Sequence, residues 1–181
     1  MVQEKDSSSA LKKALDVISE AERRGLRLRL IGGMAFAYLA PKASSSAALS
    51  RKYNDIDFVA LKSQSGEIAK LLQKLGFEPN ERFNALHGYD RLQYFYGSMK
   101  VDIFLDEFRM CHYIDLRGRL ALSEVTIPQS DLLLTKLQIF ELNEKDMKDV
   151  LALLSDLSLG NADTPRSIDA GYIANLLSND W

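Results

Sequence analysis

The run Asn54-Asp55-Ile56-Asp57-Phe58 constrains this chain more than any other feature of its sequence. Side chains in a strand alternate between two faces, so Asp55 and Asp57 project from one face while Ile56 and Phe58 project from the other and can enter a core. The two carboxylates then stand about 7 Å apart, from roughly 3.3 Å of rise per residue. Because carboxylates this close repel one another, the run predicts a strand whose polar face holds cations. Mg²⁺ suits such a place, because it binds a few carboxylates together with water and phosphate.

A third carboxylate follows in a second strand-like segment. Asp102 faces away from Val101 and Ile103, which suit a buried face. If this segment neighbours the first strand, Asp102 lies beside Asp55 and Asp57 across the sheet. The alternative is that all three aspartates are solvated carboxylates on strand edges. Their combination with the glycine pair described next favours a metal site with these three aspartates as its ligands.

Gly32-Gly33 stands between an alternating segment at residues 26–31 and an apolar segment at residues 34–39. The first predicts a half-buried strand and the second a short helix that Pro41 ends. Glycines at such a turn let backbone amides approach a phosphate, and a helix N-terminus favours an anion. Alone, a glycine pair here is often just a turn. It is neither a P-loop nor a Gly-x-Gly-x-x-Gly turn.

The remaining pattern predicts the fold class. A first helix is expected from an N-cap at residues 7–9 to Gly25. Further helices are predicted at residues 65–75, 132–142, 144–157 and 167–177, and strands at residues 55–61, 92–96, 100–105, 111–116 and 120–127. This order predicts an α/β (α+β) fold with a mixed sheet flanked by helices and a C-terminal helical extension. We expect residues 1–127 to form the core and residues 128–181 a helical part packed on it as one globular unit.

Taken together, Ile31-Gly32-Gly33, Asp55-Ile56-Asp57 and Asp102 resemble the signature of the nucleotidyltransferase superfamily named for DNA polymerase β. Many small members carry an Arg-x-Thr-x-Asp-Ile-Asp run. This chain has Arg51 at the first position of that run and Tyr53 in place of the threonine. The likeness covers about residues 26–106 and implies the polymerase β-like fold.

The resemblance also implies a chemistry. A nucleoside monophosphate would pass from a nucleoside triphosphate to a hydroxyl-bearing acceptor (a small molecule, a tRNA or a protein) with release of pyrophosphate. Asp55, Asp57 and Asp102 would hold Mg²⁺ in a two-ion site, with Asp102 also helping to deprotonate the acceptor. Gly32 and Gly33 would lie against the triphosphate. The alternative is a non-catalytic nucleotide- or partner-binding module on the same fold, such as a toxin–antitoxin component.

A further likeness lies in the C-terminal part. Lys136 and the run Lys145-Asp146-Met147-Lys148-Asp149 are similar to a lysine and an Arg/Lys-Asp-x-x-Asp run of abortive-infection toxin-type nucleotidyltransferases. The likeness makes Lys136 a candidate catalytic residue that contacts phosphate, whereas a lone lysine can also snorkel from an amphipathic helix. Asp146 and Asp149 would otherwise pair with neighbouring lysines on a solvated helix face. Arg51 either binds the nucleotide or pairs with a carboxylate at the sheet edge.

Charge and hydropathy narrow the class of partner. The 181 residues include 23 Lys and Arg against 25 Asp and Glu, a net charge of −2, which argues against strong general nucleic-acid binding. No segment approaches the roughly 18 apolar residues of a membrane helix, and no apolar signal core follows the polar N-terminus. We therefore expect a cytoplasmic protein without membrane contact. Apolar residues on the C-terminal helices would permit a homodimer or an antitoxin partner.

Overall fold

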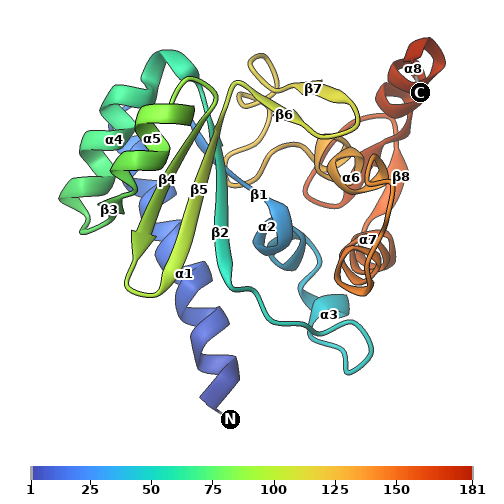
Figure 1. The fold of residues 1–181 in the computed structure, drawn as a ribbon. Helices are drawn as coiled ribbons and strands as arrows, with labels where there is room; N and C mark the ends of the chain where they lie inside the picture. Colours follow the sequence, from blue (N-terminus) through green and yellow to red (C-terminus); the bar gives the residue numbers. More distant parts are fainter. Residues whose placement is uncertain (1, 181) are drawn as a thin grey trace.

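The computed structural model describes the backbone of residues 2–180 and the side chains of residues 9–178. Its centre is a five-stranded sheet in the order β1-β2-β5-β4-β3 (Figure 1). These strands are β1 (Leu28–Ile31), β2 (Asp55–Ala60), β5 (Met99–Leu105), β4 (Arg91–Tyr96) and β3 (Glu78–Pro79). Strands β2 and β5 run parallel, and the other neighbours pair antiparallel. The expectation of a mixed sheet is therefore confirmed, and the predicted strands at residues 92–96 and 100–105 form an antiparallel hairpin.

Helices cover both faces of this sheet, and α1 and α4 lie on the opposite side from α2, α6 and α7 (Figure 1). The helices are α1 (Val2–Arg23), α2 (Gly32–Leu39), α3 (Pro41–Ser44), α4 (Ser65–Lys74), α5 (Glu81–His87), α6 (Gln129–Leu137), α7 (Glu144–Asp156) and α8 (Ala170–Asp180). A 3₁₀ turn, η1 (Lys62–Gln64), precedes α4. Helix α1 begins before residues 7–9, so the predicted serine N-cap is wrong. No helix in the described range is long and apolar enough to cross a membrane.

One apolar core joins the sheet to its helices. Ile56 and Phe58 are completely buried in it, as the alternation of β2 predicted. The same core includes Leu132 of α6 and Leu153 of α7, and α7 also packs against α2 and α3. The C-terminal helices therefore contact the helix that follows the glycine turn. The boundary at residue 127 stays a prediction.

The segment at residues 120–127, predicted as a strand, consists of turns with a single β-bridge between Leu30 and Thr126. The reason lies in Arg29, which the alternating pattern placed on a solvated face and which is buried instead. Its guanidinium donates to the carbonyl oxygens of Leu120 and Ser123, at 3.1 and 2.5 Å, and pairs with Glu22. The carbonyl oxygens of Leu120 and Ser123 therefore accept hydrogen bonds from Arg29 instead of from a neighbouring strand. Strand β1 is consequently buried along its whole length, not half-buried.

Two short pairs of strands lie outside the main sheet. They are β6 (Glu107–Arg109) with β7 (Tyr113–Asp115), and β8 (Ser158–Gly160) with β9 (Ser167–Asp169). Only the central part of the strand predicted at residues 111–116 forms, as β7. The helix predicted to start at residue 167 begins at Ala170, after β9.

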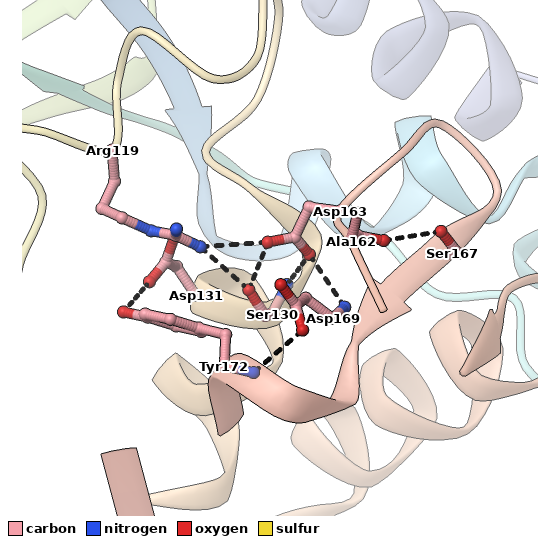
Figure 2. A network of polar contacts seen from close by, with 8 residues as sticks. All are labelled: Arg119, Ser130, Asp131, Ala162, Asp163, Ser167, Asp169 and Tyr172. Atoms are coloured by element: carbon pink, nitrogen blue, oxygen red, sulfur yellow. Dashed lines mark hydrogen bonds and ion pairs between the residues drawn. The ribbon is translucent and has the colours of Figure 1, made fainter. Parts of the chain in front are cut away.

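A buried polar cluster fixes the start of α6 (Figure 2). The Arg119 guanidinium donates to Asp131 at 2.7 Å and to Asp163 at 3.0 Å, and it lies 3.9 Å from the centre of the Tyr172 ring. The Tyr172 hydroxyl donates to the other oxygen of Asp131 at 2.8 Å. Burial raises the pKa of Asp131 although Arg119 opposes the shift. The cluster joins α6 to α8, and it thereby holds the helix whose last turn carries Lys136.

Candidate active site

The three aspartates share one face of the sheet. Strand register pairs Asp57 with Asp102 on the parallel neighbour β5, and Asp55 with Lys100. Residues paired across adjacent strands project to the same side. The predicted adjacency of the two aspartate strands is therefore confirmed, and the reading of three unrelated edge carboxylates is excluded.

A pocket of about 480 Å³ opens over this face. Its lining includes the predicted site residues Gly32, Gly33, Arg51, Asp55, Asp57 and Lys136, and it also includes Asp146. They come from the glycine turn, the segment before β2, β2 itself, the last turn of α6 and the first turn of α7. Asp102 lies below the lining, fully buried. Six of the seven predicted site residues thus line one pocket, together with Asp146.

The glycine turn is shaped by its contacts with the site. Gly32 has φ +67°, and a Cβ at this position would overlap the Asp57 carboxylate. A Cβ on Gly33 would overlap the Arg51 guanidinium and come within 2.9 Å of the Tyr53 ring. Arg51 in turn stacks 4.2 Å from the centre of that ring. Tyr53, which replaces the threonine of the resembled run, therefore positions Arg51 against the turn.

Gly32→Ala is expected to lower the free energy of unfolding and to weaken divalent-cation binding. The positive φ alone costs an alanine about 1 kcal/mol, and the overlap would push the Asp57 carboxylate aside as well. Gly25→Ala is the matched control, because Gly25 has φ +70° and nothing within 4 Å of its Cβ position. Urea unfolding and Mn²⁺ binding should separate the two variants. Equal losses of stability with unchanged Mn²⁺ binding in both would contradict a functional contact between Gly32 and Asp57.

Asp55 and Asp57 carry unpaired negative charge within the described residues, since neither carboxylate makes a hydrogen bond or ion pair with another side chain there. Burial, together with the charges of Asp102 and Asp55, raises the pKa of Asp57 to about 6, against the lowering effect of Lys100 and Arg91. A pair of carboxylate oxygens with excess negative charge, open to a pocket, fits the ligand chemistry of a divalent cation such as Mg²⁺. Asp55 and Asp57 are therefore suitable ligands for Mg²⁺.

Asp102 has a different environment. Arg91 binds it through both Nη2, 2.7 Å from Oδ2, and Nε, 3.2 Å from Oδ1, while Lys100 Nζ lies 2.9 Å from Oδ2. Gln93 donates to Oδ1 at 3.0 Å. Burial alone would raise the pKa of Asp102, but these donors outweigh it and hold the pKa below its usual range. Among the described side chains no three acidic, histidine or cysteine groups converge on a common metal position.

Two cations of the pocket lining, Arg51 and Lys136, pair with the acids of α7. Asp149 accepts from Arg51 Nε and Nη2 at 2.7 and 2.6 Å, and it lies 3.1 Å from Lys136 Nζ. Lys136 also donates to Asp146 at 2.5 Å. The expectation that Asp146 and Asp149 pair with neighbouring lysines on a solvated face is wrong, because both are buried and pair with Lys136 or Arg51. The packing of α7 on α2 and α6 brings these distant charges together.

Sequence reasoning missed the partners of Asp102. Arg91, Gln93 and Lys100 lie on β4 and β5, and the period-two spacing of Lys100 from Asp102 places both on one face. That spacing was a usable signal for Lys100. Arg91 and Gln93 depend on the β4–β5 register, in which Gln93 stands opposite Asp102.

No protein-family model and no curated protein sequence matches this chain. Among solved structures, the lincosamide antibiotic adenylyltransferase LnuA with lincomycin bound matches with a TM-score of 0.56 and 15% identity, over 80% of this chain and 96% of that one. The antibiotic-resistance factor ANT(2'')-Ia matches in its solution structure, with a TM-score of 0.56 and 13% identity over 82% of this chain and 84% of that one. The crystal structure of ANT(2'')-Ia in complex with adenylyl-2''-tobramycin matches with a TM-score of 0.54 and 15% identity, over 81% of this chain and 88% of that one. The chain therefore has the polymerase β-like nucleotidyltransferase fold.

Proposed function

We propose that the chain is a divalent-cation-dependent nucleotidyltransferase, which transfers a nucleoside monophosphate from a nucleoside triphosphate to a hydroxyl group. One observation carries this proposal. The unpaired Asp55 and Asp57 carboxylates open into the same pocket as the glycine turn, Arg51 and Lys136. Anion-binding groups and cation-binding groups thus line one cavity, which suits a metal–triphosphate complex.

The residues divide the work between the metal and the phosphates. Asp55 and Asp57 would hold Mg²⁺, which when bound neutralises phosphate charge. Gly32 and Gly33 carry no side chain of their own, so their backbone at the start of α2 would bind the phosphates. Arg51 and Lys136 would exchange part of their pairing with α7 acids for phosphate oxygens. Catalysis of this kind depends on positioning and charge neutralisation.

The proposed transfer forms one bond at the α-phosphorus and breaks another. The acceptor oxygen bonds to the α-phosphorus, and the bond from that phosphorus to the oxygen bridging to the β-phosphate breaks. Pyrophosphate leaves with the electron pair of the broken bond, and the acceptor hydroxyl gives its proton to water. The resembled family assigns help with that proton to the position of Asp102. In this chain that role, like the role of Asp102 as a metal ligand, rests on the resemblance alone.

We favour a small hydroxyl-bearing molecule as the acceptor. A volume of about 480 Å³ lies within the range of small-molecule pockets, roughly 300–1,000 Å³. The matching structures carry lincomycin and adenylyl-2''-tobramycin, and both are small-molecule complexes. A net charge of −2 gives no support to a large RNA acceptor. A homodimer, an antitoxin partner and a cytoplasmic location stay predictions.

The test is direct transfer. The protein is incubated with Mg²⁺, each nucleoside triphosphate labelled at the α-phosphate, and a panel of lincosamides, aminoglycosides, tRNA and proteins. We expect label on one class of acceptor with equal pyrophosphate release, and loss of both in Asp55→Asn. Asp16→Asn is the control, because Asp16 is an exposed residue of α1 that pairs with Lys12.

The same experiment tests the alternative. A non-catalytic module would bind a triphosphate in a Mg²⁺-dependent manner and release no pyrophosphate with any acceptor. Binding of a partner protein by both wild type and Asp55→Asn, without turnover, would support a toxin–antitoxin role instead.

A further inference from the structure

Lys100 places a cation beside the Asp102 carboxylate, on the strand next to Asp55. It is the register partner of Asp55 on the neighbouring strand, and it precedes Asp102 by two residues on β5. All three side chains therefore project from the same face of the sheet. Lys100 Nζ lies 2.9 Å from Asp102 Oδ2. An ammonium group is a compact point charge, so it can neutralise a carboxylate as a metal ion would.

Protein groups surround both carboxylate oxygens of Asp102. Oδ1 accepts hydrogen bonds from Arg91 Nε and Gln93 Nε2. Oδ2 accepts no hydrogen bond from the described residues, but it lies within ion-pair distance of two cations, Arg91 Nη2 at 2.7 Å and Lys100 Nζ at 2.9 Å. The side chain has no exposed surface. A metal ion could reach Asp102 only by displacing at least one of these donors.

Arg91 is itself held in place. Its guanidinium carbon lies 4.7 Å from the centre of the Phe104 ring and 5.9 Å from that of Phe83. Stacking on the two rings and the double contact with Asp102 fix the orientation of the guanidinium. Displacement of Arg91 would break all of these contacts together.

From this contrast between a fully neutralised Asp102 and an unpaired Asp55–Asp57 pair, we infer that Lys100, supported by Arg91, takes the place of a second metal ion. The chain then binds one divalent cation with its nucleotide, on Asp55 and Asp57. Asp102 acts as a positioning residue for Lys100 and Arg91. The inference rests on the proposed function for the role of Asp55 and Asp57, and it revises the two-ion expectation for this chain.

The test counts metal ions directly. Mn²⁺ is titrated into the protein saturated with a non-hydrolysable triphosphate analogue, and bound Mn²⁺ per bound nucleotide is measured by electron paramagnetic resonance. We expect one ion in the wild type and two in Lys100→Met, where removal of the ammonium exposes an oxygen of Asp102. Lys100→Arg keeps the charge and should keep one ion. Lys70→Met is the control, since Lys70 is exposed on α4 and pairs with Glu67.

The outcomes separate this inference from the proposed function. Two ions in the wild type, or one ion in a folded Lys100→Met, would overturn the role of Lys100 and leave the nucleotidyltransferase proposal intact. Nucleotide bound without any ion would overturn both. Circular dichroism and thermal unfolding establish that each variant is folded. If Lys100→Met fails to fold, Lys100→Gln provides the same count, because an uncharged amide also removes the cation.

Discussion

Asp57→Asn is expected to abolish nucleotidyl transfer while making the protein more stable to heat at neutral pH. Loss of a carboxylate that would hold the Mg²⁺ neutralising phosphate charge is expected to lower kcat on the order of a thousandfold. Asparagine keeps the size of the side chain and removes the charge that Asp102 and Asp55 repel. The opposite directions of the two effects distinguish a functional carboxylate from one that stabilises the fold.

The gain in stability follows from the direction of the pKa shift. The pKa of Asp57 is about 6 in the folded protein, above its ordinary value of 3.8. The stabilising contribution of its proton is complete below the ordinary value, and it is lost as the pH rises through about 6. At pH 7.5 the ionised group therefore destabilises the fold, by at most about 3 kcal/mol at 1.36 kcal/mol per unit. Asparagine removes this cost.

The measurement is thermal unfolding without divalent ions at several pH values. We expect Asp57→Asn to exceed the wild type in Tm at pH 7.5, and the difference to shrink toward pH 4.5. Added Mg²⁺ should stabilise the wild type but not the variant, because ligands that bind the native state raise its stability. Asp16→Asn should show neither pattern. A variant less stable than the wild type at pH 7.5 would contradict the electrostatic account of the site.

Asp149→Ala should cause the largest loss of stability among single substitutions of the acids that pair with Arg51 and Lys136. Asp149 is 2% exposed in its side chain and joins Arg51 and Lys136. Removing one partner of a buried ion pair leaves uncompensated charge and typically costs about 3–5 kcal/mol. In the variant, Arg51 loses both of its hydrogen bonds to α7. The substitution should therefore also loosen the helix from the glycine turn.

Urea unfolding measures this loss, with Glu144→Ala as the control on the same helix. Glu144 is 82% exposed in its side chain and pairs with Lys148, so its removal should leave stability unchanged. Asp149→Asn adds a second comparison, because it keeps a hydrogen-bond acceptor for Arg51 and should lose less than alanine. Equal stability of the Asp149→Ala and Glu144→Ala variants would show that the buried cluster does not hold α7.

Much of the site followed from local patterns. The alternation of residues 54–58 predicted which side chains of β2 are buried and which face the pocket, and the glycine pair predicted the turn into α2. Both depend on backbone geometry within a few residues, which does not change with the rest of the fold. The adjacency of Asp102 was a hypothesis from the same periodicity, and the β2–β5 register confirmed it.

Where local patterns failed, a distant side chain was responsible. Arg29 alternates as a solvent-facing residue, yet it is buried because carbonyl oxygens more than ninety residues away accept its hydrogen bonds. The same contacts replaced the strand predicted at residues 120–127. The helix predicted at residues 132–142 ends at Leu137, and Phe140 beyond it is exposed despite its apolar character. Hydrophobic periodicity reports the local pattern of a segment, and it does not show which distant residues that segment contacts in the folded protein.

The sequence by itself determined that Asp55 and Asp57 share a strand face beside a glycine turn, because a strand repeats every two residues. The tertiary structure alone decided which charges those acids meet. Strand order and register bring Asp102 into ion pairs with Arg91 and Lys100, whereas Asp55 and Asp57 form no ion pair with a described side chain. Helix packing brings Asp149 into ion pairs with Arg51, ninety-eight residues away in the chain, and with Lys136, thirteen residues away. Ion pairs form only between charges a few ångströms apart in space. Which charges pair therefore depends on the tertiary structure and not on the local sequence.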